Sequence, residues 1–380
     1  MTIYLDNAAT SFPKPESVYL AADHFQREIG ANPGRSDHRR ARSANEKVFL
    51  TRKALAKLCN IPDPARIIFT VNGTEALNLG LKGALKPGDH VITSSLEHNS
   101  VNRPLHKLAT QGVEVTRIPG DPRYGLDVNK LMGNMRDNTR MIVLTHSSNV
   151  LGTILPIAQV GALARDRGII FLVDGAQSAG KLPIDVAAMG IDLLACSGHK
   201  GLFGPQGTGF IYIREGMELE TIREGGTGSL SESSLQPDFL PDRFESGTLN
   251  GPGIAGLGAG AEFILHEGQE KIAQKEKALT IQLWEGLENL KKVKLYGPEP
   301  SLPRTSVVSF TIEGIHCEVA GTILDHVYNI EVRTGLHCAP SAHESIGTFP
   351  AGTIRVSPGY FNTQEDIEAF IRAVETIVQK

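Results

Sequence analysis

Apolar residues in the first part of the chain are gathered in short runs rich in β-branched side chains, and these runs alternate with segments of helical periodicity. Short apolar runs predict strands, and a period near 3.6 predicts helices. Strands separated by helix-length segments are typical of βαβ units and a mainly parallel sheet, whose carboxyl edge is the candidate ligand-binding edge. We predict strands at residues 66–70, 90–94, 114–118, 141–145, 169–174, 193–197 and 209–213, with helices at 76–84, 126–136 and 155–167.

The pattern changes after residue 253, where a long amphipathic stretch predicts one helical region over residues 254–290 that links two domains. Beyond it, short predicted strands (305–311, 331–333, 353–356) alternate with predicted helices (317–326, 364–378), which indicates a smaller α+β domain. Residues 224–244 are rich in Gly, Ser, Pro and Asp, and they predict a mobile or partner-contacting loop.

Length and composition agree with a two-domain α/β enzyme. The chain has 380 residues, of which 41% are hydrophobic, 21% are charged and 40 are glycines. A formal net charge of −4 with scattered Lys and Arg gives no basic surface for nucleic acid or for an anionic membrane. The first residues lack the pattern of a signal peptide, and no run approaches the roughly 20 apolar residues of a membrane span. We therefore expect a cytoplasmic protein without nucleic-acid or membrane partners.

The four cysteines are irregularly spaced and form no CxxC pair, which favours a reducing compartment. Cys59 lies in a helical pattern and Cys196 in a strand, so both are expected to be buried. Cys317 stands near a helix start, and the pattern leaves its role open. Cys338 lies in a loop bounded by Gly and Pro, where a thiol can be exposed and reactive.

Two residues at strand ends carry the candidate chemistry. Asp174 ends one apolar strand, and Lys200 follows the next strand in a Ser-Gly-His-Lys turn. Taken singly, the aspartate could serve a turn or a metal, and the lysine could be a solvated loop residue. Together they match pyridoxal 5′-phosphate (PLP), which needs an acid for its pyridinium proton and a desolvated lysine for a Schiff base. Ser197 and His199, beside the lysine, could donate to the cofactor phosphate.

At these residues the chain resembles the cysteine desulfurase and selenocysteine lyase group of the class V aminotransferase superfamily. The motifs that carry the resemblance are YLDNAAT (4–10), NGTEA (72–76), EHN (97–99), SNVLG (148–152), VDGAQ (173–177), SGHK (197–200) and RTGLHCA (333–339). They span nearly the whole chain in order. The resemblance implies an α/β fold, the PLP-dependent transferase fold type I, with a mainly parallel seven-stranded sheet in the large domain. It divides the chain into an N-terminal segment (1–15) packing with the small domain, a large domain (16–255) and a linker helix with the small domain (256–380).

The resemblance also implies roles for residues around the cofactor. Gly73 and Thr74 stand where a strand meets a helix, and they would bind the phosphate through a helix N-terminus. The alternative is an ordinary helix start with Thr74 as its N-cap. His98 would stack on the cofactor ring and move protons, as suits a group that titrates near neutral pH. Gln177 would hydrogen-bond the phenolic oxygen.

On the substrate side, the resemblance implies that Asn149 and Arg355 grip a carboxylate. Cys338 would take sulfur from L-cysteine as a persulfide and release L-alanine, before a sulfur-acceptor protein collects the sulfur. L-selenocysteine is a second candidate substrate. Thr248 would cross the interface of a homodimer to the neighbouring subunit's cofactor phosphate.

Several alternatives stay open at this point. The short loop at 333–338 resembles the second group of desulfurases, and residues 32–38 are similar to the first group. Selenocysteine cleavage, transamination and epimerisation use the same scaffold. A non-catalytic protein that accepts sulfur or regulates a partner is disfavoured by the intact Asp174, Lys200, His98 and Arg355. His337, Cys338 and His343 lack a fourth ligand at a recognisable spacing, so we predict no metal.

Overall fold

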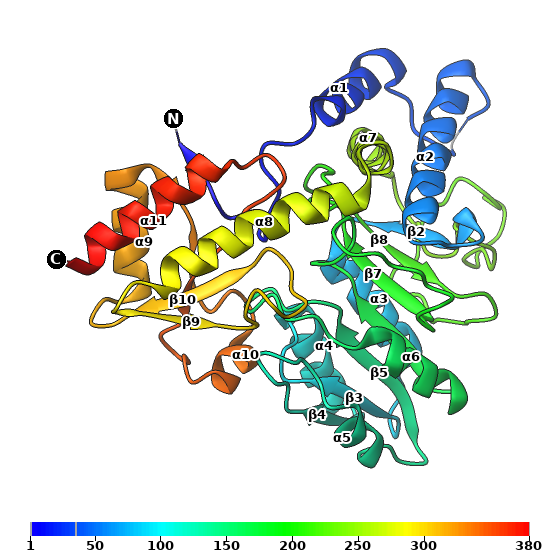
Figure 1. The fold of residues 1–380 in the computed structure, drawn as a ribbon. Coiled ribbons are helices and arrows are strands. Elements are labelled where there is room, and N and C mark those ends of the chain that lie inside the picture. The colour runs from blue at the N-terminus through cyan, green and yellow to red at the C-terminus, as the bar shows by residue number, and fades with distance from the viewer. Residues whose placement is uncertain (1, 35, 380) are drawn as a thin grey trace.

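The computed structural model describes residues 2–34 and 36–379, so Met1, Arg35 and Lys380 lie outside the description. Its central feature is a seven-stranded sheet with the strand order β2-β8-β7-β6-β5-β3-β4 (Figure 1). Only β8 runs antiparallel to its neighbours. The strands are β2 Ile67–Thr70, β3 His90–Ser94, β4 Glu114–Ile118, β5 Thr139–Thr145, β6 Ile170–Asp174, β7 Leu193–Ser197 and β8 Gly209–Ile213.

Successive residues of the central strands point alternately into two hydrophobic cores. In β6, Phe171 and Val173 belong to one core, and Leu172 belongs to the other. A sheet covered on both faces needs apolar residues at every position, which explains the continuous apolar runs. The helices of this part are α1 Glu16–His24, α2 Arg39–Leu58, α3 Gly73–Ala84, α4 Asn99–Ala109, α5 Val128–Gly133, α6 Ile157–Asp166 and α7 Gly251–Glu267, with a π-helical turn at Phe25–Ile29.

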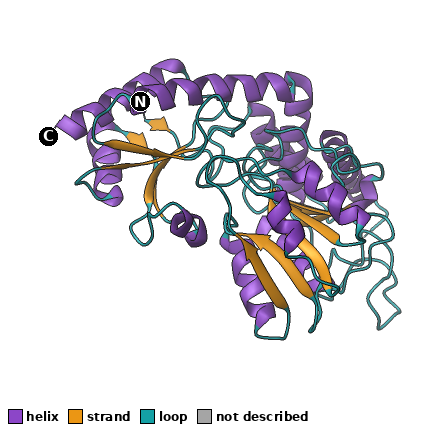
Figure 2. Cartoon of the chain, turned by 60° about the horizontal axis from the view of Figure 1, so that its bottom comes forward, coloured by secondary structure: helices purple, strands orange, loops and turns teal. Residues whose placement is uncertain are grey.

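A smaller α+β part follows, with a four-stranded antiparallel sheet ordered β12-β13-β10-β9. Figure 2 shows the two sheets well apart, with helices bridging between them. The elements are α8 Gln269–Glu288, β9 Val293–Tyr296, β10 Val308–Ile312, α9 Cys317–Tyr328, β11 Ile330–Glu331, β12 Arg333–Gly335, α10 Pro340–Ser345, β13 Thr353–Val356 and α11 Gln364–Gln379. None of the helices in the described residues is long and apolar enough to cross a membrane.

The predicted linker over residues 254–290 is two helices rather than one. Helix α7 ends at Glu267, and the following residue, Gly268, has a φ of 88° and donates to the Ile264 carbonyl at 3.0 Å. Glycine adopts this backbone conformation readily, and α8 begins directly after it. The expectation of a single helix was therefore wrong at this residue.

The N-terminal segment joins the small sheet to the large one. Strand β1 (Ile3–Tyr4) pairs in parallel with β11, and Leu5 is part of the small-domain core. The Ser11 N–H then donates to the His199 carbonyl at 3.0 Å, next to the predicted cofactor lysine. These contacts agree with a segment packed against the small domain, while the domain bounds at residues 15 and 255 stay a prediction.

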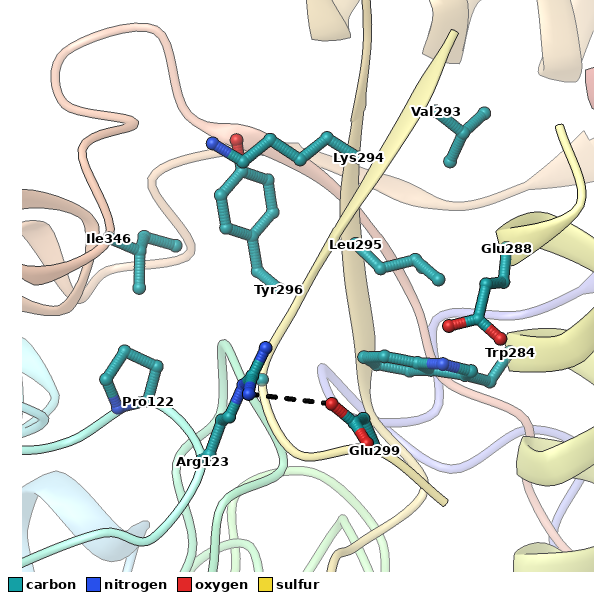
Figure 3. A pocket seen from close by; sticks show the side chains of 11 residues that line it. Pro122, Arg123, Trp284, Glu288, Val293, Lys294, Leu295, Tyr296, Glu299 and Ile346 are labelled. Carbon is teal, nitrogen blue, oxygen red and sulfur yellow. Dashed lines mark ion pairs between the residues drawn. The ribbon is translucent and has the colours of Figure 1, made fainter. Parts of the chain in front are cut away.

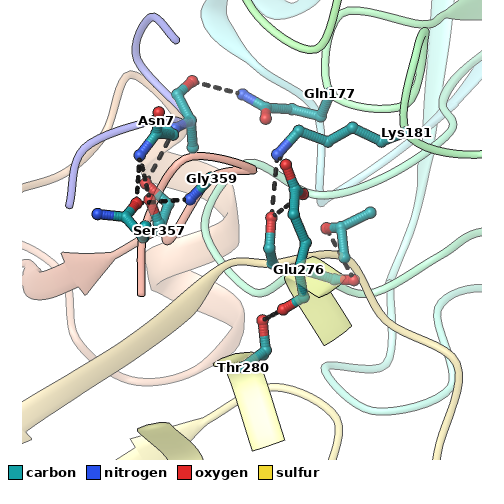
Figure 4. Close-up of polar contacts among 12 residues, drawn as sticks. Asn7, Gln177, Lys181, Glu276, Thr280, Ser357 and Gly359 are labelled. Carbon is teal, nitrogen blue, oxygen red and sulfur yellow. Dashed lines mark hydrogen bonds and ion pairs between the residues drawn. The ribbon is translucent and has the colours of Figure 1, made fainter. Parts of the chain in front are cut away.

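A buried ionic network also crosses from the large sheet to the small one (Figure 4). Lys181 donates to the Glu276 carboxylate at 2.8 Å and to the Ser306 hydroxyl at 2.9 Å, and Ser306 donates to the same carboxylate oxygen at 2.6 Å. All three side chains are buried. A buried charge pair needs every hydrogen bond satisfied, so this network fixes α8 against both parts of the chain.

Candidate active site

Most of the predicted site residues line one cavity of about 230 Å³ at the carboxyl edge of the large sheet. Its lining residues include Gly73, Thr74, His98, Asn149, Asp174, Gln177, Ser197, His199 and Lys200. They come from the ends of β2, β3, β5, β6 and β7, which lie together because parallel strands point their carboxyl ends to the same edge. This position agrees with the expectation that the carboxyl edge of the parallel sheet binds the ligand.

Asp174 is held at the end of β6 with one carboxylate oxygen engaged. Its Oδ1 accepts from the Ala176 N–H at 2.9 Å. Burial raises the pKa of Asp174, against the backbone hydrogen bond and the charge of Lys200, which both lower it. A cation at the free oxygen would hold this carboxylate ionised.

Lys200 lies in a turn that requires glycine. A Cβ at Gly198 would lie 2.2 Å from the Thr208 hydroxyl oxygen, so the chain can approach β8 this closely only without a side chain. Burial lowers the pKa of Lys200 to about 8. Arg355 and Arg333 lower this pKa further, while Asp174 and Cys338 raise it. A lysine that loses its proton near neutral pH is suited to bond covalently to a carbonyl.

His98 is the N-cap of α4 and is neutral at physiological pH. Its Nδ1 accepts from the Ser100 N–H at 3.0 Å and shares a 2.7 Å hydrogen bond with the Ser100 hydroxyl. Burial lowers the pKa of His98 to about 4, and Lys200, Arg333, Arg355 and Arg103 lower it too. The expectation of an imidazole that titrates near neutral pH therefore does not hold for this environment.

The phosphate-binding candidates surround the start of α3. Asn72, and not Thr74, is the N-cap, because the Asn72 side chain accepts from the Glu75 N–H at 2.9 Å. The alternative of Thr74 as the cap is therefore wrong, and its hydroxyl instead shares a 2.9 Å hydrogen bond with Ser100. The first N–H groups of a helix lack acceptors within it and suit an anion.

The donors of this cavity fit PLP. His199 Nδ1 is buried without a partner among the described residues, and burial lowers the pKa of this histidine to about 4. Together with Ser197 and the start of α3, it could hold a phosphate. Asp174 could hold a ring nitrogen and Lys200 the aldehyde carbon. Gln177 Nε2 donates to the Ala8 carbonyl at 2.9 Å, so this side chain also ties the N-terminal segment to the cavity wall.

Arg355 lies in the middle of β13 with no exposed surface. Its guanidinium donates to the Asp6 carboxylate at 2.5 Å and to the Asn149 carbonyl at 3.1 Å. Asp6 is the acid that an arginine in an apolar strand requires. The Asn149 side chain donates to the His337 carbonyl at 2.7 Å and thereby also holds the Cys338 loop. Arg355, through its bond to Asp6, also holds the N-terminal segment.

Cys338 is the exposed cysteine, whereas Cys59, Cys196 and Cys317 are buried. His337 and Cys338 both have positive φ, at 49° and 59°, which non-glycine residues seldom adopt. The loop is held by the Asn99 N–H, which donates to the Cys338 carbonyl at 2.7 Å. The Arg333 guanidinium donates to Cys338 Sγ at 3.4 Å. The thiol is thus exposed on a fixed loop beside His98.

Thr248 does not line this cavity. It is exposed, and its hydroxyl accepts from the Asn32 side chain at 3.3 Å. Its expected contact with a neighbouring subunit stays a prediction. In residues 2–34 and 36–379, no group of three or more His, Cys, Asp or Glu side chains is arranged to hold a metal ion.

Sequence reasoning assigned no role to four residues that shape the site. Glu97 is fully buried and accepts from the Ser94 hydroxyl at 2.6 Å and the Thr145 N–H at 2.9 Å. Burial raises the pKa of Glu97 to about 8. Glu97, Arg333 and Asp6 all lie inside motifs that carry the family resemblance, and this position could have indicated a role in the site. Ser100 lies one residue beyond the motif at 97–99, so its role was not indicated by the sequence.

Comparison with known proteins decides the family. The model of the aminotransferase class-V family matches residues 3–370. The chain belongs to this family. A probable cysteine desulfurase of Methanothermobacter thermautotrophicus is 34% identical over 99% of this chain and 94% of its own. A cysteine desulfurase of Escherichia coli O157:H7 is 35% identical over 98% and 93%.

The fold agrees with the family. The apo structure of cysteine desulfurase from Thermococcus onnurineus superposes with a TM-score of 0.93 and 36% identity, over 100% of this chain and 95% of that one. The predicted fold type I of PLP-dependent transferases is confirmed. Family members are PLP-dependent, and this chain is a PLP-dependent enzyme.

Proposed function

We propose that this protein is a cysteine desulfurase that converts L-cysteine and its own Cys338 thiol into L-alanine and a Cys338 persulfide. The observation that carries the proposal is the position of an exposed thiol beside a cavity that holds a low-pKa lysine and a buried aspartate. The relatives named as cysteine desulfurases along nearly the full chain support it.

When bound, PLP supplies an electron sink that weakens the bonds around the substrate's α-carbon. Lys200 would anchor the cofactor and, once released from it, carry a proton at Nζ. A pKa of about 8 leaves this amine partly neutral near pH 7.5, so it can both accept and return a proton. Asp174 would keep the cofactor nitrogen protonated through its free carboxylate oxygen.

Arg355 and Asn149 would bind and orient the substrate carboxylate. Asp6 already holds the Arg355 guanidinium in place, which leaves its orientation fixed before the substrate arrives. A planar guanidinium binds a carboxylate through two parallel hydrogen bonds. His98, neutral with its proton on Nε2, would cover the cofactor ring and exclude water from it.

In the sulfur-transfer step, Cys338 Sγ bonds to the substrate sulfur while the bond between that sulfur and the substrate carbon breaks. The carbon keeps the electron pair and is protonated, so the products are alanine and a persulfide, with no external oxidant or reductant. The Arg333 guanidinium, which donates to Sγ at 3.4 Å, would orient the sulfur for attack. A reductant or an acceptor protein must then remove the sulfur for a second turnover.

We further propose a cytoplasmic homodimer with a sulfur-acceptor protein as partner. Thiol chemistry at Cys338 needs a reducing compartment, and the cysteines of the described chain are free. Thr248 is exposed and does not line the active-site cavity of its own chain, as expected of a residue that contacts the cofactor of a neighbouring subunit.

The test measures alanine released from L-cysteine by the PLP-loaded enzyme with a reductant, for the wild type and for Cys338→Ser. Alanine from the wild type alone supports the proposal. Equal rates would show that Cys338 is not the nucleophile. No alanine from either protein would contradict cysteine as the substrate, and L-selenocysteine would be tested next.

A further inference from the structure

The carbonyl of His199, in the turn after β7, accepts no hydrogen bond from the large domain in the described residues. Its neighbour Gly198 is fully bonded there, because the Gly198 N–H donates to the Thr208 carbonyl at 2.9 Å and the Gly198 carbonyl accepts from the Gly204 N–H at 2.8 Å. The His199 carbonyl belongs to the peptide unit that joins this residue to Lys200. A backbone carbonyl away from bulk water needs a donor.

Residues 10–14 of the N-terminal segment supply the hydrogen bonds that this carbonyl accepts in the described chain. The Ser11 N–H donates at 3.0 Å and the Thr10 hydroxyl at 3.1 Å. The Ser11 hydroxyl and the Lys14 ammonium each donate at 3.3 Å. We call these four donors the His199 clamp. A carbonyl oxygen has two lone pairs, so the converging donors share them and hold the oxygen from several sides.

Lys14 is the charged member of the His199 clamp. Its ammonium also donates to the Ser11 carbonyl and to the Ser11 hydroxyl, both at 3.0 Å. Lys14 is half-buried, and burial lowers its pKa to about 8. No carboxylate of the described residues forms an ion pair with it. A partly desolvated cation without an anion costs folding free energy, and such a cost is expected where a residue serves the site.

The clamp acts on Lys200 through a single peptide unit. A peptide group is planar, so its carbonyl oxygen, its N–H and the two flanking Cα atoms lie in one plane. Donors that fix the His199 oxygen therefore also restrict the Lys200 Cα and the direction in which the Lys200 side chain leaves the backbone.

We propose that the His199 clamp positions Lys200 for its reaction with the cofactor, with Lys14 as the principal positioning residue. The inference rests on the proposed role of Lys200 as the residue that binds PLP. Loading joins the Lys200 nitrogen to the aldehyde carbon of PLP and releases water. This step and the later proton transfer at Nζ both require the amine at a fixed position. Lys14 does not line the active-site cavity, so it acts through the backbone.

The N-terminal segment reaches the substrate side at a separate point. Asp6 binds Arg355, and the Ala8 carbonyl accepts from Gln177, which Figure 4 shows beside the N-terminal segment. The segment thus contacts the predicted substrate arginine and the turn of the cofactor lysine through different side chains. A positioning role of Lys14 can therefore be told apart from a general role of the segment in joining the two domains.

The test measures the rate at which the apo-enzyme gains its PLP absorbance, by stopped flow, in the wild type and in Lys14→Met. Methionine keeps the length of the side chain and removes its hydrogen bonds. Loading should slow about tenfold, the range expected when hydrogen bonds from a charged donor are lost. The kcat for alanine release from L-cysteine should fall by a similar factor. KM should stay unchanged, because Arg355 keeps its partner Asp6.

Two further variants separate positioning from structure. Asp6→Asn, in the same segment, should raise KM and leave the loading rate unchanged. Lys294→Met is the matched control, because the Lys294 Nζ lies 5.2 Å from the Tyr296 ring centroid, beside a cavity of about 490 Å³ that no residue of the clamp lines (Figure 3). This variant also loses a lysine and a specific contact, and it should change neither the loading rate nor KM.

A folded Lys14→Met protein that loads PLP at the wild-type rate would overturn the proposal. Equal changes of loading rate and KM in Lys14→Met and Asp6→Asn would also overturn it, because the segment would then act only as a structural link. If Lys14→Met does not fold, Thr10→Val removes one neutral donor of the clamp and should slow loading about threefold. An unchanged loading rate in Thr10→Val would then contradict the proposal.

The clamp and the proposed function can fail separately. Borohydride reduction of the loaded enzyme fixes PLP to its lysine, and the mass of the labelled peptide identifies that lysine. A label on a lysine other than Lys200 would contradict both. Slower loading in Lys14→Met without alanine from the wild type would remove the proposed function and keep the clamp. Alanine from the wild type, a label on Lys200 and unchanged loading in Lys14→Met would keep the function and remove the clamp.

Discussion

The backbone carbonyl of Cys338 accepts a hydrogen bond of 2.7 Å from the N–H of Asn99, the first residue of α4. This bond joins the loop that carries the thiol to the residue directly after His98. The bond thereby fixes the Cys338 loop beside a cavity whose lining residues all come from the large domain.

The amine of Lys200 should control the rate of cofactor loading. Above a pKa of about 8 the amine is neutral and reactive, so the rate at which the apo-enzyme gains its PLP absorbance should rise through pH 8. The charge of Asp174 raises this pKa, so Asp174→Asn should move the midpoint to lower pH. Stopped-flow absorbance measures both. Asp192→Asn, at the opposite edge of the sheet, is the control and should leave the midpoint unchanged.

Glu97 should make folding stability fall as pH rises. Its pKa is raised from 4.5 to about 8, so between these values the folded state holds a proton that the unfolded state has lost. Stability then decreases by up to about 1.4 kcal/mol per pH unit in this window. Glu97→Gln removes this slope, and chemical denaturation at pH 5 and pH 8 measures it. A Glu97→Gln protein with the wild-type slope would contradict the assignment, and exposed Glu285→Gln is the matched control.

Breaking the buried Lys181 network should destabilise the protein strongly. Lys181→Met leaves the Glu276 carboxylate buried without its cation, which costs about 3–5 kcal/mol. The double variant Lys181→Met/Glu276→Leu removes both charges and should recover much of that loss. Urea unfolding of the two single variants and the double variant gives the coupling energy. Additive losses would show that the two charges act independently.

Arg355→Lys should raise KM for L-cysteine about tenfold or more, because an ammonium cannot form the two parallel hydrogen bonds that a guanidinium makes to a carboxylate. The KM and kcat of the PLP-loaded enzyme measure the effect. Arg372→Lys, exposed on α11, should change neither constant. An unchanged KM in Arg355→Lys would show that Arg355 does not bind the substrate and serves only as the structural partner of Asp6.

Most strands of the large sheet could be predicted closely because they are buried on both faces, although the edge strand β4 is largely exposed or half-buried. Predicted bounds at residues 90–94, 114–118, 193–197 and 209–213 coincide with β3, β4, β7 and β8. Strand β9 was missed because an edge strand of the sequence Val-Lys-Leu-Tyr buries only part of its surface and lacks an apolar run. The break at Gly268 was missed because the apolar spacing continues across it.

The site was predictable as a set of residues and not as a set of contacts. Motifs indicated Lys200, Asp174 and Arg355 by residue type and context. The pairing of Arg355 with Asp6, 349 residues earlier in the chain, depends on how the N-terminal segment meets the small sheet. The low pKa of His98 likewise depends on burial and on cations that only the fold brings near.

Persulfide formation on Cys338 is tested by the mass of the Cys338 peptide after the PLP-loaded enzyme reacts with L-cysteine without any reductant. We expect this peptide to gain one sulfur atom, in the same amount as the alanine formed, and Cys59, Cys196 and Cys317 to stay unmodified. Alanine formed with no sulfur on Cys338, or sulfur found on another cysteine, would contradict it.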